Sequence, residues 1–199
     1  MSFLSLVGVE FKKIKRSKIF LVATVILWIP SILNADMNFN MQAEGISPEN
    51  NFFIQGFMGM AWFMFPASMV VGTVLLSQTE RTNKGILKML ALPISTVKLC
   101  LAKFVVLLAL AASQILMMVG MYYISAAVVT GTQDYNFVLS PLFVFKEVGF
   151  IAVSTIPMLA FFWLLSISIQ TPIFSIGIGL ASIVPSVLMI NTKAWFAYP

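Results

Sequence analysis

The feature of this chain that most restricts its fold is a series of long apolar runs separated by short polar segments. Most of the runs approach the roughly 20 residues that a helix needs to cross about 30 Å of hydrocarbon. Because 60% of the 199 residues are apolar, a single soluble core could not bury them all, and a bilayer is the expected solvent. The runs predict five membrane-spanning helices, at residues 19–33, 57–77, 99–129, 143–169 and 173–190.

Prolines refine this division. The last two runs are separated only by a short polar segment that ends at Pro172. Proline cannot continue a helix and disfavours helical geometry in the residue before it, so two helices are expected here rather than one long one. Pro66, Pro157 and Pro185 lie inside runs, where kinks or freed backbone carbonyls are expected.

Basic residues are concentrated in two segments. Five lie before the first run, and five belong to the segment between the second and third when Lys103, at the start of the third, is counted with it; together these are ten of the twelve in the chain. Lysine and arginine favour the cytoplasmic side of a membrane, so both segments and the amino terminus are expected in the cytoplasm. The intervening segment 34–56 carries only acidic charges and is expected outside.

Residues 1–18 have a helical periodicity of their own, which predicts an amphipathic helix along the inner membrane surface. A secretory signal over residues 1–35 is the competing interpretation. The basic charges could also serve only to set the orientation of the chain in the membrane. The expected surface helix has an apolar face of Phe3, Val7, Phe11 and Ile14 and a basic face of Lys12, Lys13, Lys15 and Arg16.

The residue types that support catalysis or metal binding are scarce. The chain has no histidine, one cysteine, Cys100, and no charged residue well inside an apolar run. A metal site, a catalytic site or an ion pathway is therefore not expected. Uncharged polar residues within the runs are expected to bond across helices or back to the preceding turn rather than to contact a substrate. They are Ser113, Gln114, Ser154, Thr155, Ser166 and Ser168.

The segment 78–98 is longer than a simple connection between two helices needs, and its apolar residues keep helical spacing. Glu80 and Lys84 place opposite charges four residues apart, while Pro93 and Ser95 can end this helix and cap the next. The pattern predicts a short amphipathic helix across the cytoplasmic end of the bundle, suited to receiving motion from a soluble partner. Binding of anionic lipid through its lysines is the alternative.

This stretch resembles the type-2 ABC exporter permeases. The family pattern is an acid, a glycine, spaced leucines, Leu-Pro-[Ile/Val]-[Ser/Arg] and a lysine, matched here by Glu80, Gly85, Leu87, Leu90, Leu92, Pro93, Ile94, Ser95 and Lys103. The amino-terminal GVEFKKIKRSK is similar to the family's elbow helix. The small size, the Met- and Phe-rich spans and TERTNKGILKMLALPIS look most like lantibiotic-immunity and bacitracin-resistance permeases of Gram-positive bacteria.

The resemblance implies an all-α, polytopic transmembrane bundle forming one domain, residues 1–199, with an elbow helix and a cytoplasmic coupling helix. Family members usually have six helices, so the sixth is expected to be absent from this chain. The implied coupling residues are Glu80, Arg81, Lys84, Gly85, Leu90, Leu92, Pro93, Ile94 and Ser95. Of these, Leu90, Leu92 and Ile94 are expected to dock into the partner.

The resemblance also implies a function, namely export of a lantibiotic or similar antimicrobial peptide across a bacterial plasma membrane. The chain lacks the Gly-x-x-x-x-Gly-Lys-[Ser/Thr] loop that cradles phosphates, so ATP and Mg²⁺ are expected on a separate ATPase subunit and no cofactor on this chain. A second permease subunit, identical or homologous, is the other implied partner. The alternatives are a non-transporting scaffold or sensor that binds a partner through residues 78–98, and an intramembrane enzyme.

Overall fold

The computed structural model describes residues 3–15, 47–81, 95–133, 135–169 and 171–189, which form helices and connecting turns without any strand. The expected all-α class is confirmed for this part of the chain, and the first expected span, 19–33, lies outside it. The helices are α1 (Phe3–Lys15), α4 (Pro48–Gly59), the π-helical turn η1 (Met60–Met64), α5 (Phe65–Arg81), α7 (Thr96–Gln133), α8 (Pro141–Ser168) and α9 (Pro172–Met189).

Helix α4 begins well before residue 57, where the apolar run predicted a helix to start. Ser47 precedes it, and its carbonyl accepts a hydrogen bond from the Asn51 N–H at 2.9 Å. The Ser47 hydroxyl accepts a second one from the Asn50 side chain at 2.8 Å. Pro48 suits the first helical position, where its missing N–H is not needed, and Glu49 favours the positive end of the helix.

The π-helical turn η1 joins α4 to α5 in one continuous helical run. It ends one residue before Phe65 and two before Pro66. A proline ring clashes with the carbonyl four residues earlier in a regular α-helix, and a π-turn relieves this clash by widening the ladder. Pro66 therefore changes the local geometry, as expected. Pro157 and Pro185 lie inside α8 and α9, which continue past them, and the missing proline N–H removes one backbone hydrogen bond from each helix.

Two helical stretches are long and apolar enough to cross a membrane, namely Thr96–Thr132 within α7 and Pro141–Ser168, which is α8. Phe65–Gln78 and Pro172–Pro185 are shorter apolar stretches. The expected separation of the last two runs is confirmed, because α8 ends at Ser168 and α9 begins at Pro172.

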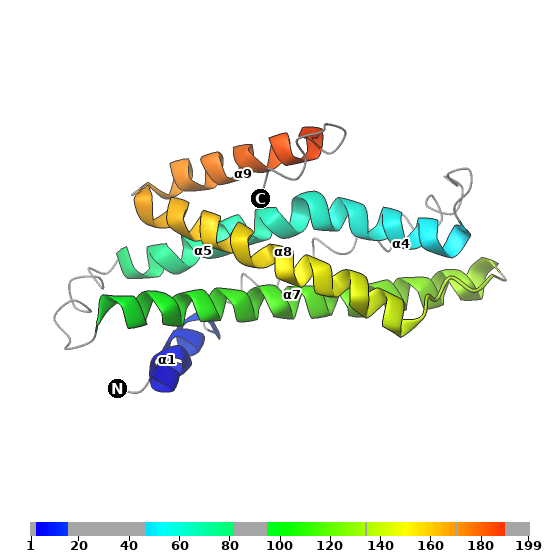
Figure 1. Ribbon diagram of the computed structural model, residues 1–199, viewed down its shortest axis with the longest axis horizontal. Coiled ribbons are helices and arrows are strands. Elements are labelled where there is room, and N and C mark those ends of the chain that lie inside the picture. The colour runs from blue at the N-terminus through cyan, green and yellow to red at the C-terminus, as the bar shows by residue number, and fades with distance from the viewer. Residues whose placement is uncertain (1–2, 16–46, 82–94, 134, 170, 190–199) are drawn as a thin grey trace.

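The helices form an elongated bundle in which α5, α7, α8 and α9 alternate in direction along the chain (Figure 1). Helix α8 packs against both α5 and α7, α9 packs against α5 and α8, and α1 crosses the amino-terminal part of α7. At one end α5 and α8 finish while α7 and α9 begin, and we call this the coupling end. At the opposite end, called the far end, α4 begins and residues 135–140 join α7 to α8.

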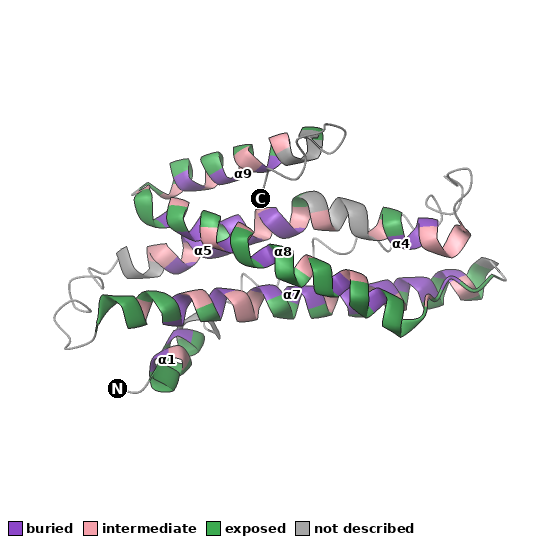
Figure 2. Ribbon diagram, in the orientation of Figure 1, coloured by how far each residue is buried: buried purple, intermediate pink, exposed green. Residues whose placement is uncertain are grey.

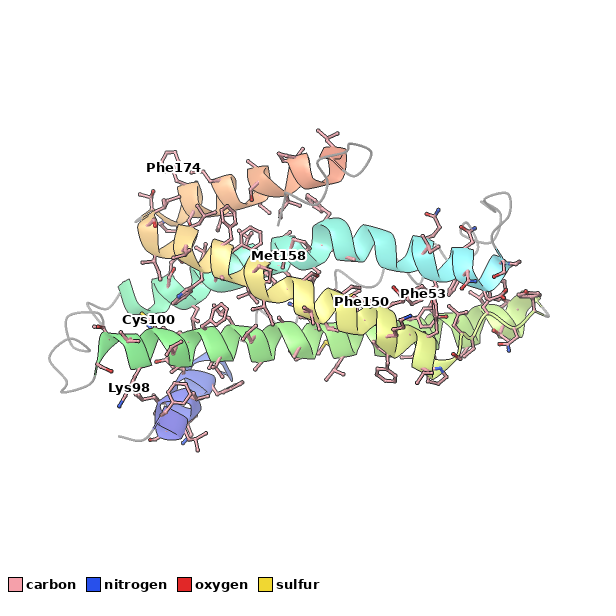
Figure 3. All side chains as sticks on the ribbon, in the orientation of Figure 1. Phe53, Lys98, Cys100, Phe150, Met158 and Phe174 are labelled. Atoms are coloured by element: carbon pink, nitrogen blue, oxygen red, sulfur yellow. The ribbon has the colours of Figure 1, made fainter. Side chains whose placement is uncertain are left out.

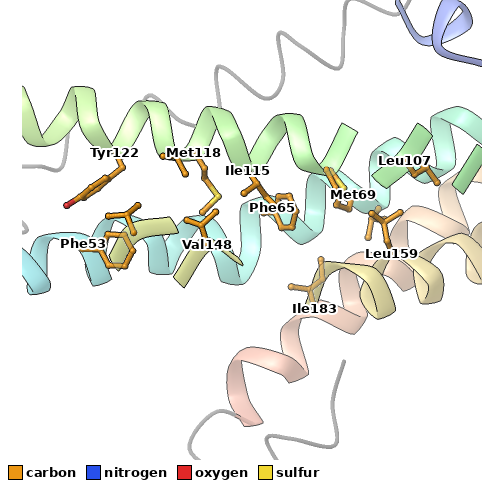
Figure 4. Close-up of a cluster of buried hydrophobic side chains, with 14 of the residues drawn as sticks. Phe53, Phe65, Met69, Leu107, Ile115, Met118, Tyr122, Val148, Leu159 and Ile183 are labelled. Atoms are coloured by element: carbon orange, nitrogen blue, oxygen red, sulfur yellow. The ribbon is translucent and has the colours of Figure 1, made fainter. Parts of the chain in front are cut away.

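The core lies along the line where α5, α7 and α8 meet (Figure 4). It is mainly apolar, and its central side chains include Phe65, Met69, Leu107, Met118 and Leu159. Large apolar side chains also cover the outer faces of α7, α8 and α9, where they are exposed (Figure 2). An apolar core inside an apolar surface is the pattern of a bundle whose outer solvent is lipid.

The far end is closed by an aromatic cluster around Phe137, whose side chain is 0% exposed. Its ring centroid lies 5.5 Å from that of Phe52 and 5.1 Å from that of Tyr135. The Phe137 N–H donates to the Thr130 hydroxyl at 3.1 Å, and its carbonyl accepts from the Tyr122 hydroxyl at 3.3 Å. The connection between α7 and α8 thus folds back onto α7 and packs on α4.

A polar contact at the same end ties α4 to this connection. The Tyr135 hydroxyl donates to Glu49 Oε2 at 2.6 Å. This bond lowers the pKa of the Glu49 carboxyl and raises the pKa of the Tyr135 hydroxyl. Since the folded-state pKa of Glu49 is lowered, the contact stabilises the fold above the ordinary glutamate pKa, and the stabilisation is lost as the pH falls through the lowered value.

Candidate functional site: the coupling end

The expected coupling segment connects α5 to α7. Arg81 is the last residue of α5 and Thr96 the first of α7, so both ends of the segment lie at the coupling end of the bundle (Figure 1). Ser95 stands immediately before α7, as the predicted cap requires, and its carbonyl accepts from the Leu99 N–H at 3.3 Å. Any force on the segment would act on these two helices first.

Only part of the expected coupling set falls within the described residues. Glu80 and Arg81 belong to the last turn of α5, although their side chains are not described, and Ser95 is exposed. The remaining predicted coupling residues lie outside the described part of the chain, and their roles stay predictions. They are Lys84, Gly85, Leu90, Leu92, Pro93 and Ile94.

A group of hydroxyls joins α5 to α8 close to the coupling end. The side-chain oxygens of Ser77 and Ser166 lie 2.6 Å apart, and the Ser166 hydroxyl also bonds the Thr73 carbonyl at 3.3 Å. Ser166 is buried, so this contact is shielded from water. Because Ser77 lies one turn before the end of α5, the contact connects α8 directly to the helix that enters the coupling segment.

A second polar contact joins α5 to α7 further along the bundle. The Ser68 hydroxyl donates to Gln114 Oε1 at 2.8 Å, and the Gln114 side chain is buried. The prediction that uncharged polar residues bond across helices is confirmed by Gln114 and Ser166. Ser113, Ser154 and Thr155 bond instead to carbonyls of their own preceding turn, which was the other expected pattern.

Replacing Ser166 with alanine should lower the free energy of unfolding by about 1 kcal/mol, because the change removes a buried interhelical hydrogen bond with little change in volume. Ser154→Ala, on the same helix, is the control: its hydroxyl is exposed and bonds only within α8. Stability would be measured by titrating the micelle-bound protein with sodium dodecyl sulfate. Equal losses in the two variants would show that the Ser77–Ser166 contact adds nothing.

The amino-terminal helix α1 forms as expected over Phe3–Lys15, but its packing face differs from the predicted apolar stripe. Leu6 and Glu10 are buried, whereas Phe3, Phe11 and Lys12 are exposed. Exposed phenylalanines are compatible with the predicted contact to lipid, which stays a prediction. The side chains of Lys13 and Lys15, and all of Arg16, lie outside the description.

Sequence reasoning missed the burial of two charged residues. Glu10 belongs to α1 and is 2% exposed, and Lys103 belongs to α7 and is 5% exposed. Lys103 was grouped with the cytoplasmic basic segment, although it lies inside the range 99–129 expected to span the membrane. The position of Lys103 in the sequence could have indicated its burial, because a lysine inside an apolar run needs a specific partner or environment.

The described residues offer no group of three or more His, Cys, Asp or Glu side chains that could hold a metal ion. What they do offer is a set of apolar helices linked by uncharged hydrogen bonds, with two stretches able to cross a bilayer by length and composition. These features are those of a helical membrane protein.

The family follows from comparison with known proteins. A family model described as "ABC-2 family transporter protein" matches residues 6–186, which is most of the chain. The chain therefore belongs to the ABC-2 transporter family, and it is a membrane permease component of an ABC transporter. Membership implies a transporter that includes an ATPase. No significant match was found among the curated proteins or the solved structures.

Proposed function

We propose that this chain is the membrane-spanning permease of an exporter driven by a separate ATPase subunit. Membership of the ABC-2 family supports a permease, and the place of the coupling segment between α5 and α7 supports a permease driven by a separate ATPase. The segment leaves α5 at Arg81 and returns to α7 at Thr96, both at the coupling end. This end would face the cytoplasm, with the amino terminus on the same side, because the basic residues gather there.

The coupling segment would carry motion from the ATPase into the bundle. Leu90, Leu92 and Ile94 would dock in a groove of the ATPase, with Glu80 and Arg81 as polar contacts. ATP and Mg²⁺ would be bound by that partner. A movement of the segment would reach α8 as well as α5 and α7, because the Ser77–Ser166 contact links α5 to α8 close to the coupling end.

The substrate we propose is a lantibiotic or a similar amphiphilic antimicrobial peptide, and the export would confer immunity on the cell. Two permease subunits, identical or homologous, would enclose the path between them. The described interior is apolar apart from uncharged hydroxyl and amide contacts and two buried charged residues, Glu10 and Lys103. Such a path suits an amphiphilic molecule taken from the outer leaflet of a bacterial plasma membrane better than a hydrated ion.

The docking role is tested by co-expressing the chain with candidate ABC ATPase subunits from the same genome and purifying the complex from membranes. Leu90→Asp combined with Ile94→Asp should abolish co-purification and reduce permease-stimulated ATP hydrolysis by roughly tenfold or more, because a buried unpaired carboxylate is costly. Val138→Asp is the control, since it adds an aspartate to an exposed site at the far end. Intact association and stimulation in the double variant would show the docking assignment to be wrong.

The substrate class is tested separately by growth in lantibiotics and in bacitracin. Cells with the complete transporter should tolerate a higher peptide concentration than cells whose ATPase cannot hydrolyse ATP. A complex that hydrolyses ATP but gives no resistance would contradict the peptide substrate. A chain that binds its partner but never stimulates hydrolysis would favour the scaffold or sensor alternative.

A further inference from the structure

Two buried charges of opposite sign belong to helices that pack together. Glu10 lies on α1 and Lys103 on α7, and α1 contacts α7. Of the charged side chains that the structure describes, Glu10 and Lys103 are the two that are buried, with exposed fractions of 2% and 5%. The other described basic residues near this contact, Lys12 and Lys98, are exposed.

The two residues also lie at matching positions along the bundle. A helix rises 1.5 Å per residue, so Lys103 lies about 10 Å beyond the start of α7 at Thr96. Helix α1 crosses α7 in this amino-terminal part, and Figure 3 shows Lys98 and Cys100, just before Lys103, at the same end of α7. This is the part of α7 that directly follows the coupling segment.

Burial makes an unpaired charge costly at this place. Removing a carboxylate or an ammonium group from water costs several kcal/mol, and this cost is offset only when an opposite charge and hydrogen bonds replace the water. Charged residues within membrane helices are accordingly found paired with one another. Each of these two side chains supplies the charge that the other requires.

We propose that Glu10 and Lys103 form a buried charged pair that fastens α1 to α7. Leu6, one turn before Glu10 on the same face, supplies the apolar part of the contact. Helix α1 and the amino-terminal part of α7 then move as one unit. A displacement delivered to the start of α7 therefore carries α1 with it, and the exposed face of α1, which includes Phe3, Leu4 and Phe11, moves along the membrane surface.

This inference concerns the fold of the chain and does not depend on the proposed substrate or ATPase. It is tested with the full chain in lipid nanodiscs by measuring the thermal unfolding midpoint. Glu10→Leu and Lys103→Met each leave one buried charge without its partner, so each should lower the midpoint clearly. The double variant removes both charges, and it should recover at least half of the midpoint lost by the less stable single variant, since replacing a whole buried pair by apolar residues is often neutral.

Charge exchange adds a second measurement, because a single variant that fails to insert would leave the first comparison incomplete. Glu10→Lys and Lys103→Glu each place two like charges together. The exchanged variant, which carries both changes, restores opposite charges. The exchanged variant should insert and unfold at a higher temperature than either single reversal. Lys12→Glu and Lys98→Glu, exposed on the same two helices, are controls that should change the midpoint little.

Two outcomes would overturn the pairing. In the first, the losses of Glu10→Leu and Lys103→Met simply add in the double variant, which means that the two charges have other partners. In the second, the exchanged variant is no more stable than the single reversals. If the unmodified chain stimulated no ATPase while the Glu10→Leu, Lys103→Met double variant still recovered its midpoint, the proposed function would be wrong and the pairing would stand.

Discussion

Replacing Phe137 with alanine should lower the free energy of unfolding by about 3 kcal/mol, the lower part of the range for a fully buried phenylalanine. The ring is completely buried and packs on Phe52 and Tyr135. The backbone hydrogen bonds of Phe137 to Thr130 and Tyr122 do not involve the ring, so the variant can keep its turn while losing the packing. Sodium dodecyl sulfate titration followed by tryptophan fluorescence would measure the loss.

Phe150→Ala is the matched control, because Phe150 is 62% exposed on the outer face of α8. Removal of a ring that already contacts the surrounding solvent creates no internal cavity, so the change should cost far less than Phe137→Ala. Similar losses in both variants would contradict the conclusion that the far end is held by a packed aromatic cluster.

Replacing Gly179 with alanine should destabilise the protein by about 2 kcal/mol through overpacking. A Cβ atom at this position would lie 2.6 Å from Cγ1 and 3.0 Å from Cγ2 of Val70. Valine is branched at Cβ and stiff, and Val70 is buried, so its methyl groups cannot easily turn away. The variant would force α9 away from α5, and the titration used for Ser166→Ala would measure the cost.

Two variants make the cause of this effect identifiable. Gly177→Ala, on the same helix, adds a methyl group that meets nothing within 4 Å, so it should be neutral or slightly stabilising because alanine favours a helix. Val70→Ala with Gly179→Ala removes the clash and should be more stable than the sum of the two single changes predicts. Strict additivity would exclude a direct clash between the two positions.

The sequence predicts best the parts of this fold in which apolar runs are long. The helical stretches of α7 and α8 were expected from their length alone, and Pro172 marks the start of α9. Most of the uncharged polar residues were also assigned correctly, because a hydroxyl inside an apolar helix has few alternatives to the preceding turn or a neighbouring helix. Gln114 and Ser166 show both the success and its limit, since their partners Ser68 and Ser77 could not be named from the sequence.

The parts that sequence reasoning missed depend on contacts between distant residues. The first part of α4 carries Glu49, Asn50 and Asn51, so it lies outside the apolar run that begins at residue 57, although Ser47 and Pro48 form a recognisable helix start. The helix is held by its aromatic packing at the far end. Likewise, the periodicity of α1 identified an apolar stripe, but it could not show that Leu6 and Glu10 would be the buried side chains instead.

The π-helical turn at Met60–Met64 has a consequence for how this sequence can change. A π-turn holds one residue more than the α-turn it replaces within about the same rotation, whereas one residue in a regular α-helix corresponds to about 100°. Deleting a single residue within the π-turn would therefore leave an α-turn and keep the face of α4 that carries Phe52 directed at Phe137. The same deletion within the regular part of α5 would turn α4 by about 100° relative to the bundle, so the π-turn marks a point at which the helix can lose a residue and keep its alignment.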